Sequence, residues 1–146
     1  VVNAVRRRGA PQRIDIETSS NLPLVRADAA LVEQAIGNVI ANALTHTSRD
    51  THIVIDGKES TASVAIRVTD DGPGIAPDLL PRIFDRFAKG NGADVVRDRG
   101  VGVGLGLAIA KGIMDAHGGS ITVESPVEGR PGTRFVMVFA REDAAP

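Results

Sequence analysis

The chain has 146 residues, a formal net charge of −1 at pH 7 and no cysteine. Hydrophobic residues make up 42% of it and charged residues 24%, the proportions of an ordinary globular domain. The net charge gives no electrostatic reason to expect nucleic acid as a partner, and the absence of cysteine excludes disulfides and thiolate chemistry. No apolar run in the sequence approaches the roughly 18 residues of a membrane span.

The N-terminal part of the sequence predicts a linker, one strand and one long helix. The first eight residues look like the end of a helix that a Gly-Ala-Pro sequence interrupts, so residues 1–13 are expected to be a linker. Residues 14–17 alternate apolar and charged side chains, as a half-buried strand does. Asp28 is placed to cap a helix that runs to about Thr47, the clearest element of the sequence.

The rest of the chain predicts a hairpin, a loop, a second helix and two late strands. Residues 52–56 and 62–69 are rich in β-branched residues and are expected to pair through a turn at Asp56-Gly57. The later elements are a short helical stretch, a polar loop, a long helix and two strands, over residues 77–87, 88–100, 105–117, 120–124 and 133–140. This order is typical of an α+β fold with helices on one face of a mixed sheet.

Two asparagines on the first long helix predict a ligand site. Asn38 and Asn42 are one helical turn apart, so both lie on one face, away from the apolar arc. An ordinary exposed face is the alternative, but such a face favours Glu, Lys or Arg, because Asn costs a few tenths of a kcal/mol in a helix. Amide oxygens are hard neutral ligands that suit Mg²⁺ when bound phosphates supply the negative charge.

A second candidate site follows the strand that ends near Thr69, where the sequence reads Asp70-Asp71-Gly72-Pro73-Gly74-Ile75. Asp, Gly and Pro also form ordinary turns, which is the simpler explanation of such a sequence. At a buried strand end, however, a carboxylate can accept a hydrogen bond from an exocyclic amine such as that of adenine. The glycines would let the backbone approach a flat ligand.

Four glycines alternate directly before the second long helix, at positions 100, 102, 104 and 106. They fit neither the dinucleotide pattern GxGxxG nor a P-loop ending in GK[ST], and the chain lacks the HRD and DFG elements of eukaryotic-type protein kinases. A loop that only needs flexibility remains possible. Glycine at the helix start instead favours phosphate binding by free amides and the helix dipole.

Taken in order, these motifs resemble the catalytic ATP-binding domain of bacterial sensor histidine kinases, especially actinobacterial ones. That domain belongs to the GHKL superfamily with gyrase B, Hsp90 and MutL. The resemblance runs from about Arg26 through five sequence boxes, at residues 31–43, 70–75, 83–87, 102–109 and 132–133, the last directly before Arg134-Phe135. It implies the Bergerat fold, a two-layer α/β sandwich in which about three helices cover one face of a mostly antiparallel sheet of about five strands. The ATP-binding domain would span residues 14–141 with a lid at 88–103, followed by a tail at 142–146.

The resemblance also implies a role for each matching residue. Mg²⁺ and the phosphates of ATP would be held by Asn38 and Asn42, and the adenine amine by Asp70. The base pocket would be lined by Gly72, Gly74 and Ile75, and Thr133 would support the adenine side. The lid would close on the phosphates through Gly102, Gly104, Leu105 and Gly106. Because Thr45 and His46 stand where many relatives carry a basic residue and Tyr, the basic phosphate contact is expected from Lys89 or Arg86.

The function implied by the resemblance is transfer of the γ-phosphate of ATP to a histidine. That histidine would lie on an upstream helical hairpin that dimerises and accepts the phosphate, since none of the three histidines here resembles the phosphoacceptor of the family. A response regulator receiver domain would be the next partner. Gln34 stands where ATPase branches carry a glutamate that activates water, so slow hydrolysis is expected. The parent protein is expected to be a homodimer anchored in the plasma membrane, with this domain in the cytoplasm. The alternatives are a nucleotide-gated interaction module and a serine-directed anti-sigma kinase.

Overall fold

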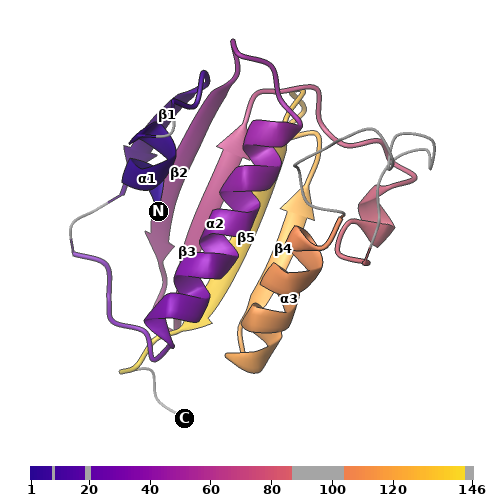
Figure 1. Cartoon of the computed structure of the whole chain (residues 1–146). Helices are drawn as coiled ribbons and strands as arrows, with labels where there is room; N and C mark the ends of the chain where they lie inside the picture. Colours follow the sequence, from indigo (N-terminus) through magenta and orange to yellow (C-terminus); the bar gives the residue numbers. More distant parts are fainter. Residues whose placement is uncertain (8, 19–20, 87–103, 144–146) are drawn as a thin grey trace.

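The computed structural model describes residues 1–7, 9–18, 21–86 and 104–143. Two layers are formed by a five-stranded sheet and by helices that lie against one of its faces (Figure 1). In chain order the elements are α1 (Val2–Arg7), β1 (Arg13–Glu17), α2 (Ala29–Thr45), β2 (His52–Glu59), β3 (Ser63–Asp70), the 3₁₀ turn η1 (Leu80–Arg82), α3 (Gly106–Ala116), β4 (Ser120–Glu124) and β5 (Thr133–Ala140). The expected α+β sandwich is confirmed.

The sheet has the strand order β1-β2-β3-β5-β4. The pair β1 and β2 is parallel, and the other neighbouring strands are antiparallel, so the sheet is mixed as expected. Because β3 and β5 are antiparallel neighbours, the last residue of β3 lies opposite the first residue of β5, and Asp70 is paired with Thr133. Two residues predicted to bind the same base are therefore adjacent at one end of the sheet.

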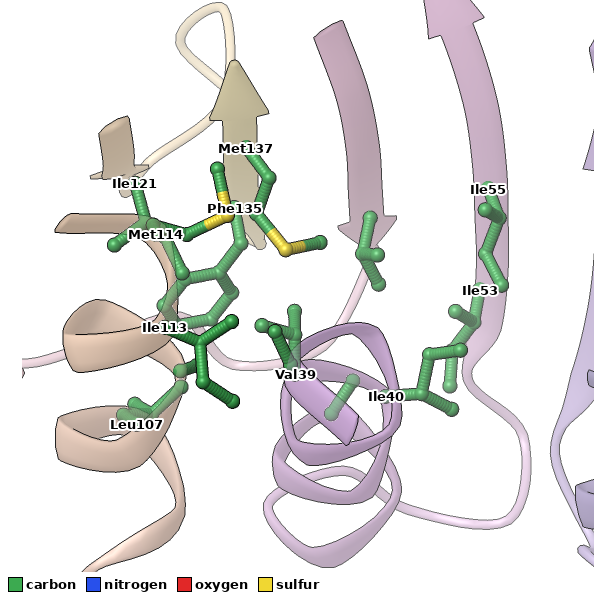
Figure 2. Close-up of a cluster of buried hydrophobic side chains, with 14 of the residues drawn as sticks. Val39, Ile40, Ile53, Ile55, Leu107, Ile113, Met114, Ile121, Phe135 and Met137 are labelled. Atoms are coloured by element: carbon green, nitrogen blue, oxygen red, sulfur yellow. The ribbon is translucent and has the colours of Figure 1, made fainter. Parts of the chain in front are cut away.

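The core lies between the sheet and the helices α2 and α3. Period-two alternation buries every second residue of β5, from Thr133 to Phe139, on the helix-facing side. Figure 2 shows Ile113 and Met114 of α3 close to Phe135 of β5, with Val39 of α2 beside them. Burying side chains of this kind contributes about 1.5–3 kcal/mol each. This packing fixes both helices, and hence the polar residues that they carry, against the sheet.

The predicted turn at Asp56-Gly57 is wrong. Both residues lie within β2, which continues to Glu59, and the chain reverses at residues 60–62. The glycine has a packing role instead of a turn role, because a Cβ at Gly57 would lie 2.5 Å from Cδ1 of Leu22. A glycine that is present because a side chain from a distant loop packs against it thus looks, in the sequence, like a glycine of a hairpin turn.

The two long helices begin and end close to the predicted positions, and a histidine joins them. Asp28 caps α2 as predicted, because its Oδ1 accepts a hydrogen bond from the Leu31 amide at 3.0 Å. The helix ends at Thr45, two residues earlier than expected. His117 follows α3; its Nδ1 lies 2.7 Å from the Ile113 carbonyl oxygen, and its Nε2 accepts from the Asp28 amide at 3.1 Å. The end of α3 is therefore tied to the start of α2.

Only part of the helical stretch predicted over residues 77–87 is present in the described portion. It is the 3₁₀ turn η1, and residue 87 lies outside the described residues. The lid predicted at 88–103 also lies outside them. The division into linker, domain and tail stays a prediction.

Gln12 connects the segment before β1 to the end of α2. Its side chain is buried, and its Nε2 donates to the carbonyl oxygens of Leu44 at 2.9 Å and Thr47 at 3.3 Å. We expect Gln12→Ala to lower the free energy of unfolding by about 1 kcal/mol, because helix-end carbonyls then lose their donor in a buried place. Removal of the Gln12 Oε1, which is buried without a partner among the described residues, offsets part of this loss. Urea unfolding measures this. The exposed Glu17→Ala variant is the control, and a Gln12→Ala loss no larger than the control's would contradict the expectation.

Candidate functional site

A cavity of about 480 Å³ opens between α2, the loop that follows β3 and the start of α3. Its size is within the range of small-molecule sites. Eight of the twelve predicted site residues line it, namely Asn38, Asn42, Asp70, Gly74, Ile75, Gly104, Gly106 and Thr133. Gly72 and Leu105 lie beside it without lining it, and Lys89 and Gly102 lie outside the described residues. Residues from four separate sequence boxes therefore converge on one cavity.

The first end of the cavity is formed by α2 and the start of α3. Asn38 is half-buried, and its Nδ2 has no hydrogen-bond partner among the described residues. A Cβ on Gly106 would lie 3.8 Å from the Cβ of Asn38, so the first turn of α3 directly faces this amide. Leu105, the residue that precedes α3, supplies no side-chain cap. Uncapped helix amides and an unpaired amide donor are suited to an anionic ligand such as phosphate.

The second end of the cavity is formed by Asp70 and the loop that follows it. Asp70 is only 6% exposed, and one carboxylate oxygen accepts from the Gly72 amide at 2.9 Å. Burial raises the pKa of Asp70 above its ordinary value, while hydrogen bonds from the backbone of Gly72 and Thr133 act in the opposite direction. A buried carboxylate with acceptor capacity beyond these bonds can recognise an amine of a bound molecule.

Gly72 has a role that differs from the expected lining of the base pocket. A Cβ at this position would lie 2.8 Å from Cγ2 of Thr47 and 2.9 Å from Oδ1 of Asp70. The glycine therefore allows the loop to close tightly around the carboxylate. Thr47 itself lines the cavity, and its hydroxyl donates to the Ala43 carbonyl oxygen at 2.6 Å.

Several lining residues were not assigned to the site from the sequence. They are mainly small or apolar: Ala41, Ala43, Thr47, Pro73, Ala76, Leu79, Ile83 and Leu107. Thr45 and His46, at the two positions where the resemblance leads us to expect a basic residue and Tyr, line the cavity as well. Phe84, which follows the lining residue Ile83, packs edge-on against Phe135, with ring centroids 6.2 Å apart. The apolar residues are suited to covering a flat ring whose edge reaches Asp70.

Other residues considered from the sequence lie away from this cavity. Gln34 is exposed on α2 and is not a lining residue. His52 contacts Asp15 at 2.8 Å, and His117 joins the two long helices. Within residues 1–7, 9–18, 21–86 and 104–143, no cluster of three His, Cys, Asp or Glu residues is arranged to hold a metal ion, and no helix is long and apolar enough to cross a membrane.

Comparison with known proteins agrees with this geometry. The family described as histidine kinase-, DNA gyrase B-, and HSP90-like ATPase matches residues 27–143. The sensor protein KdpD of Clostridium acetobutylicum is 38% identical over 130 residues, which are 89% of this chain and 14% of KdpD. The sensor histidine kinase TrcS of Mycobacterium tuberculosis is 38% identical over 133 residues, which are 86% of this chain and 26% of TrcS. The chain thus spans 14% of the length of KdpD and 26% of the length of TrcS.

Among solved structures, the mycobacterial sensor histidine kinase MprB is similar over nearly the whole chain. The TM-score is 0.79 at 27% sequence identity, and the match covers 96% of this chain and 90% of the MprB chain. Sequence and structure comparisons therefore agree on the same family and the same fold.

Proposed function

The chain belongs to the family of histidine kinase-, DNA gyrase B- and HSP90-like ATPases, and on this basis we propose that it is the ATP-binding catalytic domain of a sensor histidine kinase. It would transfer the γ-phosphate of ATP to a histidine outside this chain. One observation carries the proposal. The side-chain amides of Asn38 and Asn42 and the start of α3 lie at one end of the cavity, and the buried carboxylate of Asp70 lies at the other. These ends are suited to the two chemically different parts of a nucleotide.

Adenine recognition is assigned to Asp70 and its surroundings. The 6-amino group of adenine is a donor, and Asp70 is an acceptor held in place by the Gly72 amide. The apolar side chains of Ile75, Leu79 and Leu107 would cover the faces of the ring. The burial that raises the pKa of Asp70 also strengthens a hydrogen bond to it, because the local dielectric constant is low.

Triphosphate binding is assigned to the end of the cavity near α3. The unpaired Nδ2 of Asn38 and the amides at the start of α3 are donors for phosphate oxygens. The residues present also fit Mg²⁺, because the amides of Asn38 and Asn42 offer neutral oxygen ligands to an ion that takes its other ligands from phosphates and water. When bound, Mg²⁺ would neutralise charge on the phosphates. Lys89 or Arg86 is proposed as the basic phosphate contact.

Phosphotransfer is proposed to be faster than hydrolysis. The residue four positions before Asn38 is Gln34, whose amide cannot remove a proton from water. In phosphoryl transfer the protein acts mainly by positioning and electrostatic stabilisation, so an imidazole brought in line would be the productive acceptor. None of the described contacts of His52 and His117 brings them to the cavity, and His46 is part of its lining.

The partners of this domain are proposed from the same family. The phosphoacceptor would be a helical hairpin upstream of the domain in the same protein, and a response regulator receiver domain would then accept the phosphate. The parent protein would be a homodimer anchored in the plasma membrane, with this domain in the cytoplasm. Its relatives are named as sensor proteins and are several times longer than the chain, which supports this arrangement.

The proposal predicts little ATP turnover by the chain alone and rapid transfer once the hairpin of the parent protein is added. We expect steady-state hydrolysis by the chain on the order of 100-fold or more below the rate of transfer to the hairpin, because Gln34 provides no general base. Labelled ATP measures both, with a hairpin whose histidine is replaced by Gln as the control.

Three results would contradict the proposed function. They are labelling of a histidine within the isolated chain, turnover as fast as that of dedicated ATPases, and labelling of a serine on a partner in place of the hairpin histidine. The last result would favour the serine-directed alternative, and ATP-dependent partner binding without any transfer would favour the interaction module.

A further inference from the structure

Ser125 lies directly after β4 and bridges two loops that are far apart in the sequence. Its Oγ accepts a hydrogen bond from the Ile75 amide at 2.9 Å, in the loop after β3. The same Oγ donates to the carbonyl oxygen of Gly132 at 2.7 Å, in the residue before β5. The hydroxyl therefore acts as acceptor and donor at once, which a side chain of this size achieves only with an O–H group.

The two bridged loops both belong to the base-binding end of the cavity. Ile75 lines that cavity, and Gly132 precedes Thr133, which also lines it and is paired with Asp70. Ser125 itself is not a lining residue. It can therefore act on a bound base only through the loops that it holds.

Close backbone packing at this junction leaves little room for adjustment. Gly74 has a φ of +80°, and a Cβ there would lie 2.7 Å from Oγ of Ser125 and 3.2 Å from the carbonyl oxygen of Gly132. Gly132 has a φ of +146°, and a Cβ there would lie 2.3 Å from the carbonyl oxygen of Asp70. The loops thus touch through backbone, and the Ser125 hydroxyl fixes how far apart they lie.

We infer that Ser125 is a positioning residue that sets the spacing between the loop at residues 72–75 and Thr133, and thereby the selectivity for adenine over guanine. The inference rests on the proposed function and deepens it. Adenine offers an amine to Asp70, whereas guanine offers a carbonyl oxygen at the same ring position, which a carboxylate repels. That discrimination requires the base to be held at a fixed position relative to the Asp70 carboxylate. If the loop at residues 72–75 is loosened, either base can shift relative to this carboxylate.

Ser125→Ala would leave the Ile75 amide and the Gly132 carbonyl without their shared partner. We expect the affinity of the chain for ATP to fall about tenfold, and its affinity for ADP to fall by the same factor, because the loss lies on the adenosine part common to both. The preference for ATP over GTP should fall at least about threefold. Ser125→Thr, which keeps the hydroxyl, should stay within about threefold of wild type for every ligand.

Isothermal titration calorimetry of the 146-residue chain with ATP, ADP and GTP tests these values, with circular dichroism as the check on folding. Ser60→Ala is the matched control: Ser60 also accepts a backbone hydrogen bond in a turn, from the Ser63 amide at 3.0 Å, but it lies outside the cavity. If Ser125→Ala does not fold, Ser125→Cys replaces it, and a smaller fall in the same ATP to GTP preference is expected.

The outcomes separate the inference from the function on which it rests. If the wild type binds ATP but Ser125→Ala, or Ser125→Cys in its place, keeps the wild-type preference for ATP over GTP, the inference alone is overturned, even if that variant melts at a lower temperature. A loss confined to ATP, with ADP unaffected, would also overturn it. Failure of the wild type to bind ATP would overturn the proposed function and the inference together.

Discussion

Asp70→Asn is expected to weaken ATP binding by about 100-fold and, at neutral pH, to raise the melting temperature of the ligand-free chain. The binding loss follows from hydrogen-bond polarity. The one amide oxygen of Asn is needed by the Gly72 amide, which now bonds to Oδ1 of Asp70 at 2.9 Å, so the NH₂ group would meet the adenine amine donor to donor. Loss of a hydrogen bond to a charged group together with an unpaired donor supports a change of this size.

The gain in stability follows from the sign of the pKa shift. Burial raises the pKa of Asp70 in the folded chain, so the folded state binds its proton more tightly than the unfolded state does. The stabilisation from this protonated form is fully present below the unfolded pKa and is lost as the pH rises through the folded pKa. At neutral pH the ionised carboxylate therefore costs stability, and an uncharged Asn removes that cost.

Melting curves at pH 7 and at pH 4 test this reasoning together with ATP titrations. The difference in melting temperature between Asp70→Asn and wild type should shrink as the pH is lowered. ATP affinity of the wild type should begin to fall at a higher pH than that at which an ordinary carboxylate titrates. Asp78→Asn, at an exposed position outside the cavity, is the control. An Asn variant that melts below wild type at pH 7 would show that the carboxylate is needed for the fold itself.

The elements that the sequence predicts well are those with local causes. Asp28 caps α2 through a bond to an amide three residues later, and β5 alternates buried and half-buried residues from Thr133 to Phe139. The predicted hairpin turn is in the wrong place, because Gly57 leaves room for the side chain of Leu22, a residue 35 positions earlier. Nothing in the local sequence distinguishes a glycine that makes a turn from one that accommodates a distant side chain.

The same distinction applies to the site. The sequence predicts Asn38 and Asn42 as site residues because an amide pair is unusual on a helix face, and Asp70 because it ends a strand. All three line the cavity. Thr47 and Ser125 carry no comparable signal, because the cavity wall and the loop bridge exist only once segments 25 to 50 residues apart have packed together. The residues proposed to contact the ligand are therefore predictable from residue type and local periodicity, whereas the residues that position them can be found only from the tertiary structure.

Asn38→Ala is expected to lower phosphotransfer by on the order of 100-fold or more without lowering stability. Its Nδ2 is buried without a partner among the described residues, and such a donor costs about 1–3 kcal/mol in the ligand-free fold. Alanine also favours a helix by up to about 0.7 kcal/mol relative to other residues. These gains offset the contacts that the shortened side chain loses, so the melting temperature should stay equal or rise.

Asn38→Ala should change nucleotide binding in a different way from Asp70→Asn. Asn38 faces the first turn of α3 at the phosphate end, so AMP affinity should be nearly unchanged, and the increase in ATP affinity that Mg²⁺ gives the wild type should disappear. Calorimetry with AMP, and with ATP in the presence and absence of Mg²⁺, measures this, and the labelled transfer assay measures the rate. Asn3→Ala makes the same chemical change at an exposed position of α1 and should leave every value unchanged. An equal loss of AMP and ATP affinity in Asn38→Ala would place this residue at the wrong end of the nucleotide.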